Sequence, residues 1–143
     1  MPTITRTFAS ADATETAFYD AMTQGDLDAM MRLWADEDEI VCIHPGAPRL
    51  IGHVAIRASW EAVFSRGGID IRPVERHVLH ATMTATHNVI EIIGHDSGEA
   101  QDRHVLATNI YLKTPAGWRI MLHHASIAPG AAPMETAPPS TLH

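Results

Sequence analysis

One histidine stands where a hydrophobic strand runs into a rigid turn. Residues 39–44 alternate so that Ile40, Cys42 and His44 share one face of the predicted strand, and Pro45 prevents its continuation. An imidazole on an otherwise apolar face titrates near neutrality and can take or give a proton at working pH. We therefore predict that His44 is the leading catalytic residue, against the alternative that it is a hydrogen-bonded core histidine.

Two further histidines are adjacent on the last predicted strand. His123 and His124 must point to opposite faces of that strand, so they cannot bind one metal ion together. A pair formed by His44 and His123 would lack the third ligand that zinc usually requires. We expect neither a metal nor a cofactor.

Composition limits the class of protein. The chain has 143 residues, 45% of them hydrophobic, which suits one globular domain. A net charge of −7 without a cluster of Lys or Arg argues against nucleic acid as a partner. No apolar run approaches the roughly 18 residues of a membrane span, and a signal-peptide pattern is lacking. We expect a soluble cytoplasmic protein with no membrane partner, in which Cys42 is an inert buried thiol.

Three helices are predicted in the N-terminal half. The first covers residues 10–24, is capped by Ser10 or Asp12 and ends at Gly25. The second follows a cap at Asp26 and covers residues 27–34. The third begins at residue 52 or 53 and stops at residues 67–68.

The pattern then changes to alternation, which predicts strands at residues 69–82, 87–95, 100–113 and 118–127. Turn signals are found at residues 85–86, 96–98 and 114–117, and short loops make consecutive strands antiparallel neighbours. The expected fold is α+β, with the helices covering one face of a curled antiparallel sheet. We expect the domain to occupy residues 1–128 and residues 129–143, rich in Pro and Ala, to form a disordered or loosely packed tail.

With three helices available, the second face of the sheet needs a partner. On the last predicted strand, Trp118, Ile120 and Leu122 lie opposite Arg119, Met121 and His123. The face carrying Trp118, Ile120 and Leu122 is predicted to pair with a second copy of the chain, which makes the protein a homodimer.

The sequences AFYDAMTQGDLDAMMRLWADEDEIVCIHPGAPRLIGHVAIRASWEAVF and NIYLKTPAGWRIMLHHAS resemble the SnoaL-like group of the NTF2-like superfamily, which also contains the ketosteroid isomerases. The resemblance covers roughly residues 14–126. It implies a cone in which three N-terminal helices pack on a curved antiparallel sheet. The fold serves isomerases, cyclases, hydrolases, dehydratases and proteins without catalysis, so the resemblance alone does not name a reaction.

The isomerase pattern also implies roles for single residues. His44 matches the position of the aspartate that shuttles the proton, and Asn109 matches the acid that donates a hydrogen bond to the enolate oxygen. The isomerase tyrosine falls near Phe18 or Tyr19, and His123 is placed inward in a supporting role. Because both carboxyl groups are replaced, steroid isomerisation itself is not expected. The predicted catalytic set is His44, Asn109 and His123.

Aromatic residues complete the predicted pocket, although helix-stripe tryptophans are also ordinary core volume. Two functions are compatible with these residues. The first is a cofactor-independent isomerase or lyase that acts by proton transfer on a small molecule. The second is a non-catalytic dimeric ligand-binding or scaffold domain. The predicted substrate-binding residues are Tyr19, Trp34, Trp60, Tyr111 and Met121.

Overall fold

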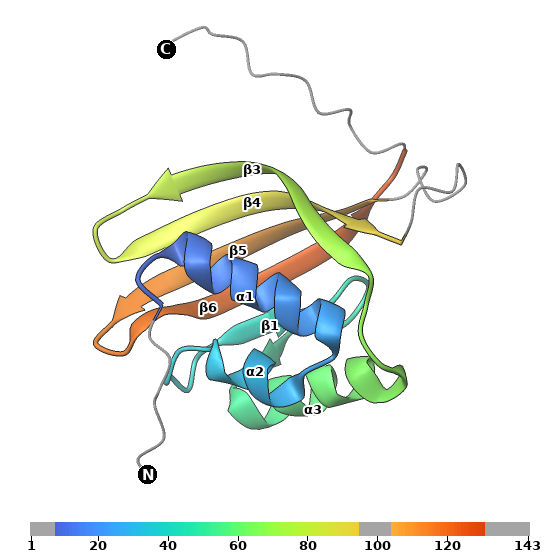
Figure 1. The fold of residues 1–143 in the computed structure, drawn as a ribbon, viewed down its shortest axis with the longest axis horizontal. Helices are drawn as coiled ribbons and strands as arrows, with labels where there is room; N and C mark the ends of the chain where they lie inside the picture. Colours follow the sequence, from blue (N-terminus) through green and yellow to red (C-terminus); the bar gives the residue numbers. More distant parts are fainter. Residues whose placement is uncertain (1–7, 95–103, 131–143) are drawn as a thin grey trace, which may run out of the picture.

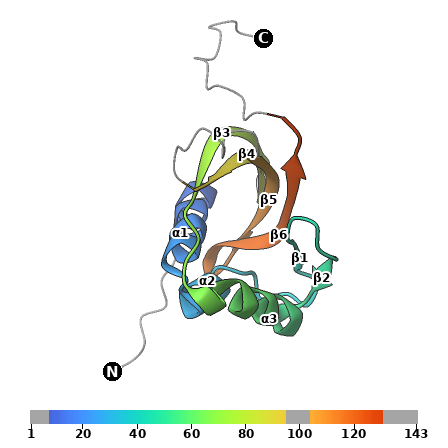
Figure 2. The ribbon, with the colours of Figure 1, turned by 90° about the vertical axis from the view of Figure 1, so that its right-hand side faces the viewer.

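A curved six-stranded sheet with its helices on the concave side forms the fold (Figure 1). The computed structural model describes residues 8–94 and 104–130. Turned by 90°, the sheet curls around α1, while α3 closes the cone from below (Figure 2). The α+β cone expected from the sequence is confirmed. The helices are α1 (Ala11–Gln24), α2 (Leu27–Arg32), α3 (His53–Val63) and a short 3-10 helix η1 (Phe64–Arg66).

The strands are arranged in the order β2-β1-β6-β5-β4-β3. Strands β3 to β6 are antiparallel to their neighbours in sequence, as expected from their short connections. Strand β1 pairs with β6 in parallel, an arrangement that the sequence did not predict. The bounds are β1 (Val41–Ile43), β2 (Leu50–Ile51), β3 (Ile71–His80), β4 (Thr84–Ile93), β5 (His104–Thr114) and β6 (Gly117–Ala128).

Capping residues set the limits of the first two helices. The Ser10 hydroxyl accepts a hydrogen bond from the Ala13 N–H, so Ser10 rather than Asp12 is the cap of α1. Gly25 ends α1 in the left-handed region, with φ of 64°. Asp26 caps α2 through the Ala29 N–H, as predicted.

The turn between β3 and β4 is displaced from its predicted place. Ala85 and Thr86 are paired strand residues of β4, and the chain reverses at residues 81–83. Ala85 is 1% exposed and lies on the inward face with His87 and Val89, so burial overrode the weak turn signal. The turn predicted at residues 96–98 and the C-terminal tail from residue 131 lie outside the described residues.

A β-bulge in β6 corrects the predicted dimer face. His123 pairs with Asn109 and Leu122 with Ile110, but the next pair is Ile120 with Tyr111, so the pairing shifts by one residue at Met121. Ile120 therefore points into the core and is fully buried. A single face carrying Trp118, Ile120 and Leu122 does not exist, because Trp118 packs against the core and Leu122 lies on the opposite side.

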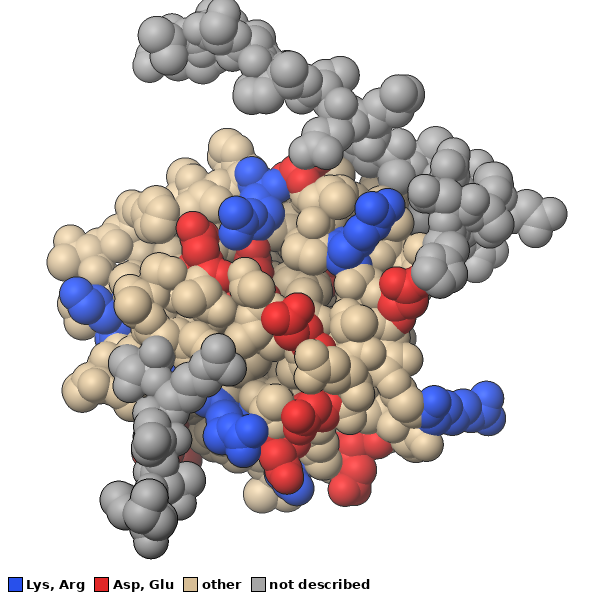
Figure 3. All heavy atoms as spheres, viewed as in Figure 1, with Lys and Arg blue, Asp and Glu red and all other residues tan. Residues whose placement is uncertain are grey.

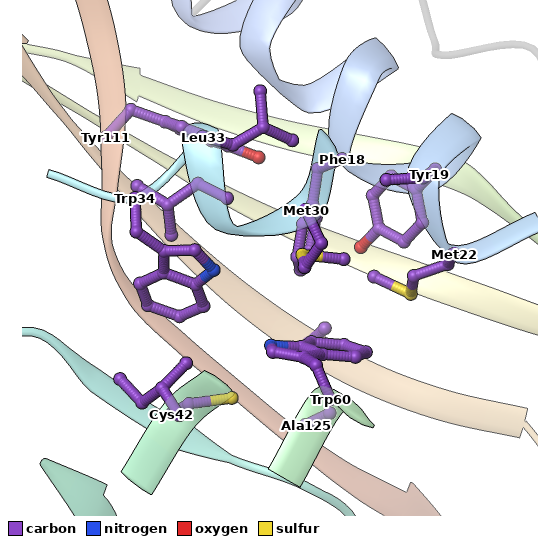
Figure 4. Packing of buried hydrophobic residues seen from close by; sticks show 14 of the residues in the cluster. Phe18, Tyr19, Met22, Met30, Leu33, Trp34, Cys42, Trp60, Tyr111 and Ala125 are labelled. Atoms are coloured by element: carbon purple, nitrogen blue, oxygen red, sulfur yellow. The ribbon is translucent and has the colours of Figure 1, made fainter. Parts of the chain in front are cut away.

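The core fills the space between the helices and the concave face of the sheet. Figure 4 shows Phe18 and Tyr19 of α1 above Trp60 of α3, with Met30 between the helices. Phe18 meets the Trp60 ring edge-on, with 5.9 Å between ring centroids. This packing fixes the position of α1 and α3, which carry Glu15, Tyr19 and Ser59 of the site described next.

Candidate functional site

His44 lies just beyond the end of β1, half-buried beside α3. Its Nε2 is 3.0 Å from the Ser59 hydroxyl oxygen, and that hydroxyl donates its own proton to the Ile56 carbonyl oxygen at 2.7 Å. Nε2 of His44 is therefore the donor in this bond, which assigns the lone pair of the neutral ring to Nδ1. Burial lowers the pKa of His44, so the ring is neutral at physiological pH.

The wall around His44 is aromatic. The His44 ring meets the Trp60 ring edge-on at 4.7 Å, and the His123 ring lies 6.1 Å from the same tryptophan, measured between centroids. Both histidines thus border Trp60. Cys42 contacts this group through its sulfur, 3.7 Å from Nε2 of His44, and burial raises the pKa of its thiol to about 12.

His123 and Asn109 are joined by a short hydrogen bond. They face each other across β5 and β6, and Nδ1 of His123 donates to Oδ1 of Asn109 at 2.6 Å. His123 is only 2% exposed. Burial, followed by the charges of His44 and His124, lowers the pKa of His123 to about 3. His123 faces inward and is a neutral donor, whereas His124 is exposed on the other face.

The Asn109 amide is already occupied within the protein. Its Nδ2 donates to the Tyr19 hydroxyl at 3.1 Å and to Oε2 of Glu15 at 3.3 Å, while Oδ1 accepts from His123. All of these partners are buried. An oxyanion would therefore have to replace one of these acceptors before Asn109 could stabilise it.

Glu15 of α1 is the centre of a buried network. Oε2 of Glu15 accepts from the Tyr111 hydroxyl at 2.6 Å and lies 2.9 Å from Nδ1 of His87, and Oε1 accepts from Arg76 at 3.3 Å. Burial raises the pKa of Glu15, but the hydrogen bonds from His87 and Tyr111 outweigh it, so the pKa is lower than usual. Glu15 is a buried carboxylate.

Glu91 of β4 is a second buried carboxyl with the opposite shift. It accepts a 2.7 Å hydrogen bond from the Tyr19 hydroxyl and is 3% exposed. Burial, aided by the charge of Glu15, raises the pKa of Glu91 to about 7 in spite of that bond. Two carboxyls in one network, one ionised and one near half-protonation, form a pair suited to acid and base chemistry.

The predicted binding residues divide into two groups. Tyr19, Trp34, Trp60 and Tyr111 are each at most 4% exposed and belong to the core cluster. Tyr19 and Tyr111 direct their hydroxyls into the Glu15 network. Met121 instead occupies the bulge of β6 and is half-buried.

Sequence reasoning missed Glu15, His87, Glu91 and Ser59. A signal for three of them was present. Glu15 precedes Tyr19 by four residues, which places the carboxyl on the inner stripe of α1. His87 and Glu91 alternate with Val89 on the inward face of β4. Ser59 carried no distinguishing signal, because it lies near His44 only through the packing of α3.

The described residues contain no group of three or more His, Cys, Asp or Glu side chains that could hold a metal ion. Nor does any helix among them have the length and apolar character needed to cross a membrane. A surface groove of about 740 Å³ lies outside the cone, against the outer side of α1 and beside Arg32 and Arg119. It shares no residue with the network of Glu15.

The fold is that of a cone-shaped α+β domain, and its interior holds a cluster of polar side chains next to aromatic rings. The chain belongs to the SnoaL-like domain family, whose pattern matches residues 12–130. The chain also matches the F-box protein SKIP8 of Arabidopsis thaliana, with 29% identity over 119 residues. That match covers 78% of this chain but only 47% of the plant protein, so the chain spans about half of that relative.

Solved structures show the same fold. One is a domain from Thiobacillus denitrificans ATCC 25259, provisionally assigned as a calcium/calmodulin-dependent protein kinase type II association domain. It has a TM-score of 0.78 and 35% identity over 86% of this chain and 98% of that one. A provisionally assigned dehydratase of the NTF2-like family from Streptomyces avermitilis has a TM-score of 0.70 and 29% identity over 82% and 93%. A ketosteroid isomerase-like protein from Erwinia carotovora atroseptica, with 16% identity, 81% and 92% coverage and a TM-score of 0.65, shows the fold alone.

Proposed function

We propose that this protein binds a small organic molecule in its cone and moves a proton on it, as an isomerase or lyase. One observation carries the proposal: the hydrogen bond of His44 to Ser59 leaves the lone pair of a neutral, half-buried imidazole on Nδ1. Such a nitrogen is suited to remove a proton next to a carbonyl group. The chemistry uses side chains alone and requires no cofactor.

In this proposal His123 and Asn109 assist His44 as the base. Because the pKa of His123 is about 3, its ring stays neutral and adds no positive charge when His44 becomes protonated. Asn109 would act by exchanging its bond to Tyr19 for a bond to the ligand oxygen. In this proposal Trp60 and Tyr19 are in contact with the ligand, and Trp34, Tyr111 and Met121 complete the wall of the binding site. The relative from Streptomyces avermitilis, provisionally assigned as a dehydratase, is compatible with this class of reaction.

A second function has its own support. Glu15, Tyr19, Asn109 and His123 satisfy one another without a ligand, as in a structural network. The 35% identity with the provisionally assigned association domain favours a non-catalytic binding or scaffold role in the same way. Both functions retain the predictions of a homodimer and a cytoplasmic location.

Proton exchange on a simple ketone separates the two functions without knowledge of the natural substrate. 1-Tetralone is incubated with the protein in D₂O, and deuterium incorporation next to its carbonyl is followed by NMR. Wild type should exceed the buffer rate, and His44→Ala should lose a factor of about 10²–10⁴ above background, the usual contribution of a general base. Asn109→Ala should lose less than His44→Ala.

His124→Ala is the matched control, because His124 is exposed on the opposite face of β6 and should keep the wild-type rate. Thermal shifts with the same ketone are measured in parallel. If the ketone stabilises the protein but exchange stays at the buffer rate, the binding function is correct and catalysis is wrong. An unchanged rate in His44→Ala would exclude His44 as the base.

A further inference from the structure

The indole N–H groups of Trp34 and Trp60 are buried and lack a hydrogen-bond partner. Trp34 is 4% exposed and Trp60 2% exposed, so water does not readily solvate either donor. A buried donor without an acceptor costs about 1–3 kcal/mol relative to a satisfied one. Tertiary structures rarely tolerate two such donors in one core unless something satisfies them.

These two donors are directed at the same region. Figure 4 shows the nitrogen of Trp34, which follows α2, and that of Trp60 of α3 each on the side of its ring that faces the other tryptophan, with Cys42 nearby. His44 adjoins this region, since its ring lies 4.7 Å from that of Trp60 and its Nε2 lies 3.7 Å from the Cys42 sulfur. Two unpartnered hydrogen-bond donors therefore point toward one region, and the His44 ring packs against one of the two tryptophans.

We propose that the indole N–H groups of Trp34 and Trp60 bind the carbonyl oxygen of a neutral ligand, next to His44. This proposal rests on the proposed function and names the class of substrate: a ketone, ester or lactone with an apolar body. An acceptor oxygen about 2.9 Å from an indole nitrogen would satisfy the donor. As His44 removes the neighbouring proton, negative charge develops on this oxygen, and the N–H groups would stabilise it.

The charge of the cone favours a neutral acceptor over a carboxylate. Glu15 is ionised within the same interior, and Glu91 is partly ionised near neutral pH. An anionic ligand would add a further negative charge to this low-dielectric interior, where Arg76 already pairs with Glu15. The assignment also resolves the difficulty at Asn109, whose amide already has buried acceptors. The tryptophans are unoccupied donors, whereas Asn109 is an occupied one.

The test compares 1-tetralone with tetralin, a hydrocarbon of nearly the same shape without the oxygen. Indole N–H resonances are recorded by ¹H–¹⁵N NMR and assigned with Trp34→Phe, Trp60→Phe and Trp118→Phe. The ketone should move the N–H signals of Trp34 and Trp60 downfield, and tetralin should not. Trp118, which is half-buried elsewhere in the chain, is the internal control.

Affinity supplies a second measurement. Trp60→Phe should weaken binding of the ketone by roughly 3- to 10-fold more than it weakens binding of tetralin, the value of one net hydrogen bond, because the loss of ring surface affects both ligands alike. If Trp60→Phe does not fold, the wild-type resonances still decide the question. Bound ketone without a shift at Trp34 and Trp60, or no shift at millimolar ketone, would overturn the proposal.

Failure of this inference differs from failure of the proposed function. Downfield shifts without deuterium exchange would support the indole site and reject His44 as a base. Exchange that depends on His44 without indole shifts would keep the base and reject the indole site.

Discussion

At the residue scale, burial shifts the pKa values of an acid and a base in the interior in opposite directions. Burial raises the pKa of Glu91 to about 7 and lowers that of His123 to about 3. Both residues therefore favour their neutral forms in the folded protein. The stability that His123 contributes is present above pH 6.5 and is lost as the pH falls toward 3, because the unfolded chain binds the extra proton.

Glu91 gives the opposite dependence. Its folded pKa lies above the ordinary value of 4.5, so the stabilising protonated form is lost as the pH rises from 4.5 through about 7. Glu91→Gln should therefore be more stable than wild type at pH 8, by about 1–3 kcal/mol, and similar at pH 4.5. Urea denaturation at both values measures this difference.

Glu61→Gln serves as the control, because Glu61 is exposed on α3 and should change stability little at either pH. A Glu91→Gln protein whose stability relative to wild type does not depend on pH would show that the pKa of Glu91 is the same in the folded and unfolded chain.

At the element scale, the end of α1 is fixed by a close approach of two glycines. A Cβ on Gly68 would lie 1.9 Å from the Thr23 carbonyl oxygen, and a Cβ on Gly25 would lie 2.8 Å from the Gly68 nitrogen. The backbone that follows η1 therefore packs directly on the end of α1. This contact holds α3 against α1 and so helps to position Trp60 over Phe18.

Gly68→Ala should accordingly destabilise the protein by more than about 2 kcal/mol, because backbone must move to admit the methyl group. Gly46→Ala is the comparison: Gly46 has φ of 72° but open space around it, so only the conformational cost of about 1 kcal/mol applies. Thermal unfolding of both variants checks the order. Equal losses would mean that the approach at Gly68 is easily relaxed.

At the scale of the whole molecule, the outer face of the sheet is the remaining candidate for a dimer contact. Ile110 of β5 and Leu122 of β6 pair there and are half-buried. Figure 3 shows acidic and basic side chains interspersed on the face that carries α1. A contact through that face would have to desolvate these charges. A contact through the outer face would leave the cone and His44 accessible.

We expect light scattering at micromolar concentration to give twice the chain mass of 15.6 kDa. Leu122→Glu should reduce the mass to that of one chain, since a charge on an apolar contact must be desolvated. Lys113→Glu, an exposed substitution near the end of β5, should leave the mass unchanged. A single-chain mass for wild type would refute the homodimer.

The sequence by itself determined the three helices, the antiparallel run of strands and much of the apolar interior. Caps, glycines and periodicity fixed α1, α2 and α3 closely, and alternation placed His44 inward, because these signals are local. The face of Ile120 could not be predicted, since one extra residue at a bulge reverses the alternation and depends on the partner strand.

Only the tertiary structure decided how the polar residues combine. Glu15, His87 and Asn109 are separated by tens of residues, and folding brings them within hydrogen-bond distance. The occupied state of Asn109 and the unpaired indoles of Trp34 and Trp60 likewise follow from packing between distant elements. Sequence patterns specify which side chains enter the cone, whereas the contacts among them depend on strand register and helix position, which are non-local.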